Sequence, residues 1–217
     1  MEENKSENKS EVSFPLLHKL KYLDDKRLNY ISKPSIIDKI LEVTFLRFMP
    51  KFITPNALTI FRILTIPFVA FLLIQEYYAS GTFLFVISAF SDALDGAMAR
   101  TRHQVTDWGI LFDPLADKLL IGTTAMIIVP KFVGLYVAIA IVFLELLIMV
   151  SAFYRFGAKV MPAKLAGKIK MILQSFSIGF LLLYVIVGTP MLLIVATYLI
   201  YGAIFFALVS LFVYRSI

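Results

Sequence analysis

The chain has 217 residues, of which 59% are hydrophobic and 17% charged, and its mean hydropathy is +0.84. This composition excludes a soluble domain of the same size and indicates a single polytopic membrane domain. The formal charge of +6 suits contact with anionic lipid headgroups rather than nucleic acid, because no soluble basic face is visible. The absence of cysteine excludes disulfides.

Two segments precede the strongly apolar part of the chain. Residues 1–34 begin with a polar run and are predicted to form a disordered or loosely structured cytoplasmic tail. Residues 35–50 are predicted to form an amphipathic helix in the membrane interface, because they are too short and too charged to span. Packing of this helix on the protein's own loops is the alternative. Its expected apolar face contains Ile36, Ile37, Ile40, Leu41, Phe45 and Phe48, with Asp38, Lys39, Glu42 and Arg47 mostly elsewhere.

Residues 51–217 are predicted to form an all-α transmembrane domain with about six spans. The expected spans are 56–74, 82–100, 109–129, 133–155, 169–187 and 190–212. Basic residues gather in the tail and in the links 100–108 and 156–168, so both termini are expected on the cytoplasmic side. The sequence therefore predicts an integral membrane protein, of a bacterial inner or plasma membrane, with a polar site that faces the cytoplasm.

The first span opens with a polar face. Asn56, Thr59 and Arg62 are three residues apart and so share one side of a helix. An arginine at this depth needs a partner, and either a cluster of aspartates or a bound phosphate would supply it.

Four aspartates lie where the second span ends and the third begins: Asp92, Asp95, Asp113 and Asp117. Each pair projects from one helical face, and antiparallel packing of the two helices would bring all four together. Such a cluster repels itself unless cations neutralise it, and oxygen ligands favour divalent ions such as Mg²⁺ or Mn²⁺. The sequence therefore predicts a metal site within the membrane domain.

Small and basic residues accompany these acids. Gly96 and Ala99 would leave a bare strip of backbone that a ligand can approach closely. Arg100 places a cation where a metal-bound diphosphate would lie. Farther along, Glu145 in the fourth span is expected to pair with a base or another polar group. A basic cluster that could attract a phosphate on a second substrate follows it, containing Arg155, Lys164, Lys168 and Lys170, with Arg102 as a further base from the 100–108 link.

The segment 92–117 resembles the signature of the CDP-alcohol phosphotransferases, Asp-x2-Asp-Gly-x2-Ala-Arg-x8-Gly-x3-Asp-x3-Asp. Every fixed position is met, by Asp92, Asp95, Gly96, Ala99, Arg100, Gly109, Asp113 and Asp117. The helix that opens Asn56-x2-Thr59-x2-Arg62 also matches the family, and the looser likeness continues to the C-terminus. The first fifty or so residues lie outside it.

The resemblance implies an enzyme of phospholipid biosynthesis that transfers a phosphatidyl group from CDP-diacylglycerol to an alcohol and releases CMP. It implies that Asp92, Asp95, Asp113 and Asp117 hold two divalent cations, and that Asp117 is the general base. The donor nucleotide would bind among six residues: Asn56, Thr59, Arg62, Gly96, Ala99 and Arg100. A homodimer is one predicted oligomeric state.

The acceptor is less sharply indicated. The runs FDPLADKLL (112–120) and GKIKMILQ (167–174) look most like phosphatidylglycerophosphate synthases, which use glycerol 3-phosphate. Those enzymes commonly carry Arg-Glu in the fourth span, where this chain has Leu144–Glu145. Cardiolipin synthases, which use phosphatidylglycerol, and phosphatidylinositol-phosphate synthases are the alternatives. A cation transporter or channel and a catalytically inactive scaffold are hypotheses from other classes, disfavoured by the absence of a polar path outward and by the intact signature.

Overall fold

The computed structural model describes residues 36–47, 49–50, 53–102, 104, 106–156 and 165–215. Every regular element in these ranges is helical, which confirms the predicted all-α fold. The elements are α2 (Ile36–Leu41), the π-helix η1 (Glu42–Leu46), α3 (Pro55–Ile74), α4 (Tyr78–Thr101), α5 (Asp107–Phe132), α6 (Leu135–Phe156), α7 (Leu165–Val187) and α8 (Pro190–Arg215). The predicted tail, residues 1–34, lies outside the described residues.

The six long helices α3–α8 match the six predicted spans to within a few residues at each end. In the described part of the chain, four are long and apolar enough to cross a membrane: Pro55–Ile74, Tyr78–Thr101, Ala166–Val187 and Pro190–Phe212. A shorter apolar helix covers Leu135–Ser151. Helix α5 does not meet the same composition because it carries Asp113, Asp117, Lys118 and Lys131. The protein is therefore a polytopic membrane protein with a polar interruption in α5.

Local chemistry sets the helix ends near the acidic signature. Thr54 caps α3, since its side chain accepts a hydrogen bond of 3.3 Å from the Ala57 amide. Thr106 caps α5 in the same way, with 3.0 Å to the Gly109 amide. At the other end of the bundle, Gly188 has a φ of +75° in the short α7–α8 turn, a conformation that suits glycine.

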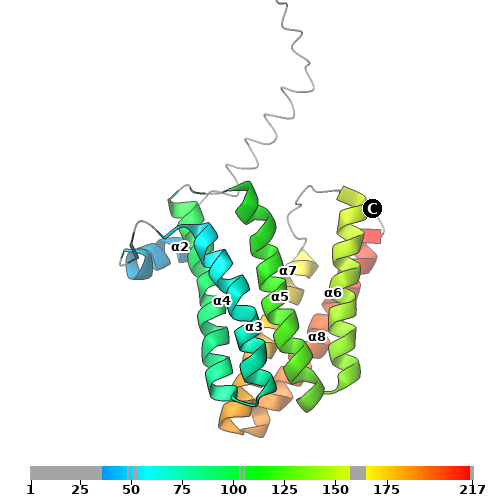
Figure 1. The fold of residues 1–217 in the computed structure, drawn as a ribbon. Helices are drawn as coiled ribbons and strands as arrows, with labels where there is room; N and C mark the ends of the chain where they lie inside the picture. Colours follow the sequence, from blue (N-terminus) through cyan, green and yellow to red (C-terminus); the bar gives the residue numbers. More distant parts are fainter. Residues whose placement is uncertain are drawn as a thin grey trace, which may run out of the picture.

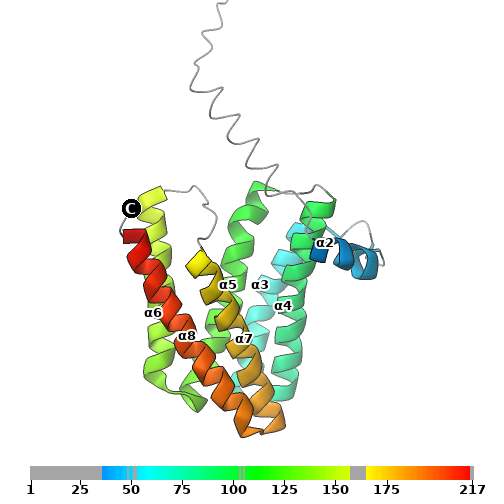
Figure 2. The ribbon, with the colours of Figure 1, turned by 180° about the vertical axis from the view of Figure 1, so that it is seen from behind.

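Helix α3 lies between α4 and α5 and packs closely on both, whereas α4 and α5 make few direct contacts (Figure 1). The main apolar core includes Val69 and Leu73 of α3, Phe85 of α4, and Leu120 and Ile128 of α5. The two acidic helices do contact each other, as expected, but each packs more extensively on α3. Helices α7 and α8 form a second tightly packed pair, and α6 lies against α5 and α8 (Figure 2).

The predicted amphipathic helix is shorter than 35–50 and consists of α2 followed by the π-turn η1. It lies beside α4, at the end of the bundle where α4 ends and α5 begins (Figure 1). Leu46 is buried against Leu94, Ala97 and Met98 of α4. Its position in the membrane interface stays a prediction.

The structure shows which side of this segment α4 covers. Ile40 and Phe45 of the apolar face are 59% and 46% exposed, which is compatible with a face directed at lipid, whereas Asp38, placed off that face, is 3% exposed. Asp38 finds an arginine on α4, which compensates its burial.

Candidate active site

Arg62 of α3 joins the two acids of α4. Its side chain is fully buried; Nη1 lies 2.7 Å from Asp92 Oδ1, and Nη2 forms a second ion pair with Asp95. Asp95 is as buried as the arginine, whereas the Asp92 side chain is 42% exposed. The prediction that the aspartate cluster provides the partner of Arg62 is therefore confirmed. Arg62 also reaches α5, since Nη1 lies 3.4 Å from the Asp113 carbonyl oxygen.

Thr59, one turn before Arg62, connects α3 to α5. Its hydroxyl donates to Asp113 Oδ1 over 2.5 Å and lies 3.4 Å from Asp95 Oδ2. Because the hydroxyl has one proton, the nearer carboxylate receives it. Thr59 and Arg62 thus bring Asp92, Asp95 and Asp113 to one place from two different helices.

A polar link at the start of α5 completes this end of the site. Thr106 donates its hydroxyl to Asn56 Oδ1 over 2.9 Å, while it caps α5 through Gly109. A Cβ at Gly109 would lie 3.2 Å from Thr106 Oγ1, 3.4 Å from Asn56 Oδ1 and 3.4 Å from Asp113 Oδ2. Gly109 therefore lets the beginnings of α3 and α5 approach each other beside Asp113.

Asp117 lies one turn farther along α5 and lines a small pocket toward α6 and α7. Lys118, Ile121, Glu145, Met171 and Gln174 line it as well. Asp117 is close enough to Asp92 and Glu145 for electrostatic repulsion with both. This fourth acid forms no hydrogen bond or ion pair with Arg62 or Thr59 among the described residues, although the Arg62 charge acts on it, and it faces a pocket of its own.

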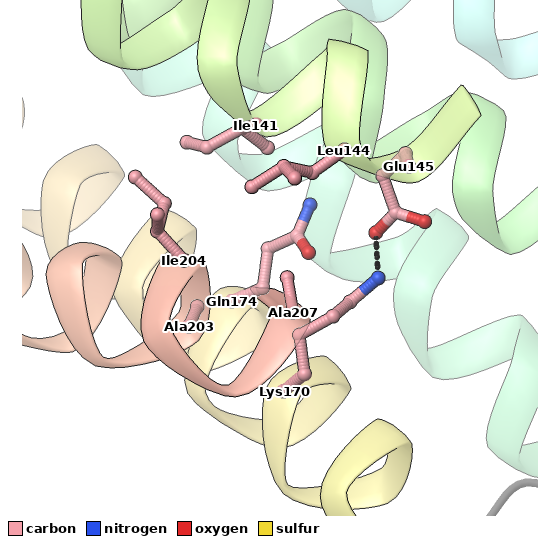
Figure 3. A pocket seen from close by; sticks show the side chains of 8 residues that line it. All are labelled: Ile141, Leu144, Glu145, Lys170, Gln174, Ala203, Ile204 and Ala207. Carbon is pink, nitrogen blue, oxygen red and sulfur yellow. Dashed lines mark hydrogen bonds and ion pairs between the residues drawn. The ribbon is translucent and has the colours of Figure 1, made fainter. Parts of the chain in front are cut away.

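A second pocket continues between α6, α7 and α8, lined in part by Glu145 and Gln174 (Figure 3). Glu145 of α6 and Lys170 of α7 point toward each other, and Lys170 Nζ donates to Glu145 Oε1. The expectation that Glu145 pairs with a base is thus confirmed. The other oxygen, Oε2, is buried and has no hydrogen-bond partner among the described residues. This pocket wall consequently offers an unused acceptor atom beside a buried cation.

The small-residue strip on α4 is occupied in part by an arginine. A Cβ at Gly96 would lie 3.1 Å from Arg100 Nη2, so the guanidinium rests over the bare backbone. Arg100 pairs with Asp38 of α2 through two hydrogen bonds of 2.7 Å. Ala99 is partly buried on the same helix.

The predicted acceptor-phosphate residues do not all come together. Arg102 donates to the Leu46 carbonyl oxygen over 3.1 Å and so contacts η1 rather than the Asp117 pocket. Lys168 is exposed in the first turn of α7. Arg155 belongs to the last turn of α6, but its side chain lies outside the described part, as does the whole of Lys164. Lys118 is the base that lines the Asp117 pocket, and Lys170 lines the second pocket beside Glu145.

Two site residues were not predicted. Thr106 has a local signal, since a threonine three residues before a glycine at the start of a helix fits an N-cap. Asp38 has none, because its partner is 62 residues away in the sequence.

The four aspartates are the candidate metal ligands. Among the described residues, no three acidic or histidine side chains converge closely enough to hold a metal ion as they stand. The donor chemistry nevertheless suits a hard divalent ion, because the four carboxylates outnumber the one buried guanidinium among them, that of Arg62, which pairs with Asp92 and Asp95. The residues thus fit such ions in ligand type and charge.

Comparison with known proteins shows the family. The family model for CDP-alcohol phosphatidyltransferases matches residues 52–211. A CDP-diacylglycerol–glycerol-3-phosphate 3-phosphatidyltransferase from Rickettsia typhi is 38% identical over 136 residues, which cover 59% of this chain and 75% of the relative. Proteins of the same name from Haemophilus influenzae and Bacillus subtilis are 36% and 30% identical, covering 61% and 75% of this chain and 76% and 93% of the relatives. The chain therefore belongs to the CDP-alcohol phosphatidyltransferase family and is a transferase.

Proposed function

We propose that the protein transfers a phosphatidyl group from CDP-diacylglycerol to glycerol 3-phosphate and releases CMP. Family membership supports the donor, and the printed name shared by the relatives from Rickettsia, Haemophilus and Bacillus supports the acceptor. The observation that carries the proposal within this chain is the complete acidic signature, assembled by Arg62 and Thr59 with Asp117 facing a separate pocket. Two adjoining places are what a transfer between two substrates requires.

In the proposed reaction the donor binds at the acidic cluster and the acceptor binds in the pocket beside Asp117. The acceptor hydroxyl oxygen attacks the phosphorus that carries the diacylglycerol, and the bond from that phosphorus to the CMP oxygen breaks. Asp117 takes the proton of the attacking hydroxyl as general base. The donor would lie against Asn56, Thr59, Arg62, Gly96, Ala99 and Arg100, and its acyl chains would remain in lipid.

The acceptor is proposed to enter the pocket between Asp117 and Glu145. Glu145 Oε2 is a buried carboxylate oxygen that lacks a donor, and a hydroxyl group on a polyol would supply one. Lys170 holds the other oxygen of the same carboxylate and contributes a positive charge to the adjoining pocket between α6, α7 and α8. Arg155, Lys164 and Lys168 belong to the end of α6, the link after it and the start of α7, and are proposed to bind the acceptor phosphate.

Two divalent cations, Mg²⁺ or Mn²⁺, are proposed to bind Asp92, Asp95, Asp113 and Asp117. Divalent ions held by these four carboxylates would supply positive charge against the charge that develops as CMP leaves. The oxygen ligands and the surplus of negative charge over Arg62 support this proposal. The site is proposed to face the cytoplasm of a bacterial cell, where soluble glycerol 3-phosphate and CMP can exchange with it. The homodimer stays a prediction.

The test is CMP release by the purified protein in mixed micelles containing CDP-diacylglycerol. Glycerol 3-phosphate, inositol phosphate and phosphatidylglycerol are supplied separately, each with Mg²⁺ and with EDTA, and Asp117→Asn is the matched inactive control. We expect CMP release only with glycerol 3-phosphate and Mg²⁺, and none from the control. Turnover with phosphatidylglycerol instead would identify a cardiolipin synthase. Cation flux into proteoliposomes without CMP release would identify a transporter.

A further inference from the structure

Helix α2 contributes one buried acid to the edge of the candidate active site. The Asp38 side chain is 4% exposed, and its two oxygens accept hydrogen bonds of 2.7 Å from Nε and Nη2 of Arg100. This two-point contact uses the side of the guanidinium that a carboxylate matches best, and it fixes the plane of the group. Neither hydrogen bond uses Nη1.

The guanidinium fixed in this way lies on the acidic helix itself. Nη2 and Nη1 of Arg100 would be 3.1 and 3.4 Å from a Cβ at Gly96, the residue that follows Asp95. Arg100 is also close enough to Asp92 and Asp95 for electrostatic attraction to both. A freely rotating arginine at this position would be drawn to those carboxylates. Asp38 supplies a competing carboxylate from α2 and holds the guanidinium through two hydrogen bonds.

The acid is itself firmly placed. Leu46, at the end of η1, packs into α4 against Leu94, Ala97 and Met98. The Leu46 carbonyl oxygen accepts a hydrogen bond from Arg102. The segment α2–η1 is thus anchored on α4 independently of Asp38, so removal of the acid should leave the helix docked.

We propose that Asp38 is a positioning residue of the donor site, which makes α2 a functional part of the active site. Asp38 orients Arg100 so that its Nη1 edge can bind the diphosphate of a CDP-linked donor while Asp92 and Asp95 stay available. The inference rests on the proposed function, because it assumes a donor bound at the acidic signature. It predicts that loss of Asp38 weakens binding of the donor and leaves binding of the acceptor unchanged. A purely structural role of α2 would instead affect both substrates.

The test compares Asp38→Asn and Asp38→Glu with Glu42→Gln, a matched control that makes the same acid-to-amide change on an exposed residue one turn later. Michaelis constants are measured for CDP-diacylglycerol and for glycerol 3-phosphate. We expect Asp38→Asn to raise the KM for the donor roughly tenfold, since one charge-assisted contact is lost. The KM for the acceptor should stay within about twofold, Asp38→Glu should recover most of the donor affinity, and Glu42→Gln should behave as wild type.

A direct binding measurement separates this proposal from the proposed function. Binding of CDP-diacylglycerol is followed in an Asp117→Asn background, without turnover. Weaker binding with Asp38→Asn, and equally with Arg100→Lys, would support the positioning role whichever alcohol is the acceptor. Unchanged donor binding would overturn the proposal. It would also be overturned if Asp38→Asn raised the Michaelis constants for donor and acceptor equally, as the packing variant Leu46→Ala would if it only loosened α2. Failure of the wild type to bind CDP-diacylglycerol would instead refute the proposed function.

Discussion

Replacement of Arg62 by methionine should uncouple the three helices that form the acidic site. Arg62 is fully buried, and methionine keeps most of the apolar stem while it removes the charge. Asp95 would then be left buried without its cation, whereas Asp92 is 42% exposed and can be hydrated. Removal of one partner of a buried ion pair costs about 3–5 kcal/mol, and Asp95 should account for most of it. Such a loss lowers the midpoint of thermal unfolding by on the order of 10 °C in a chain of this size.

Thermal unfolding of the purified protein in detergent, with EDTA and with Mg²⁺, measures this effect. Arg47→Met is the control, because Arg47 is exposed. In EDTA, Arg62→Met should unfold well below wild type. Mg²⁺ should stabilise the variant more than the wild type, since a ligand that binds only the folded state raises its stability and the acids have lost their own cation.

The double variant Arg62→Met/Asp95→Asn tests the assignment of the cost to Asp95. With no charge left on that side chain, most of the lost stability should return, so the two changes should be strongly non-additive. An Arg62→Met midpoint equal to wild type in EDTA would refute the reasoning, because it would show that Arg62 does not compensate the buried carboxylate. Additive losses in the double variant would show that packing, rather than charge, is what Arg62 contributes.

Three further predictions concern two residues of the site and the N-terminal tail. Asp113→Asn should abolish CMP release and weaken Mg²⁺ binding, because an amide is a poor ligand for a hard cation; full turnover would rule out Asp113 as a metal ligand. Gly96→Leu should displace the Arg100 guanidinium, which lies 3.1 Å from the Cβ position, and so block donor binding without loss of expression in membranes; unchanged binding would place the nucleotide elsewhere. Deletion of residues 1–34 should leave steady-state CMP release largely intact, because the deletion stops short of α2; loss of turnover in a folded truncation would show that the tail reaches the site.

Much of the fold follows from short-range patterns. Long apolar runs have one stable solution in a bilayer, because helices satisfy their own backbone hydrogen bonds, and the six long helices lie where those runs are. The acidic signature is local within each helix, since helical spacing puts Asp92 and Asp95 on one face and Asp113 and Asp117 on another. The need of Arg62 for a carboxylate partner could also be predicted, because a lone charge at that depth is too costly.

The contacts that depend on which helix lies beside which could not be predicted. That α3 stands between α4 and α5, and that Thr59 connects Asp95 with Asp113, is a result of packing among three helices that all have apolar faces. In such a sequence a lipid-exposed helix and a buried helix are both apolar, so hydrophobic periodicity does not indicate which helices pack together.

The amphipathic segment shows the same division most clearly. Its sequence by itself determined that residues near 36–46 form a helix with a polar and an apolar side, because those properties depend on neighbours three and four residues apart. Only the tertiary structure decided that Asp38 points inward and that Ile40 and Phe45 point outward. The physical reason is that Asp38 pairs with Arg100, which is 62 residues away and therefore invisible to a local pattern.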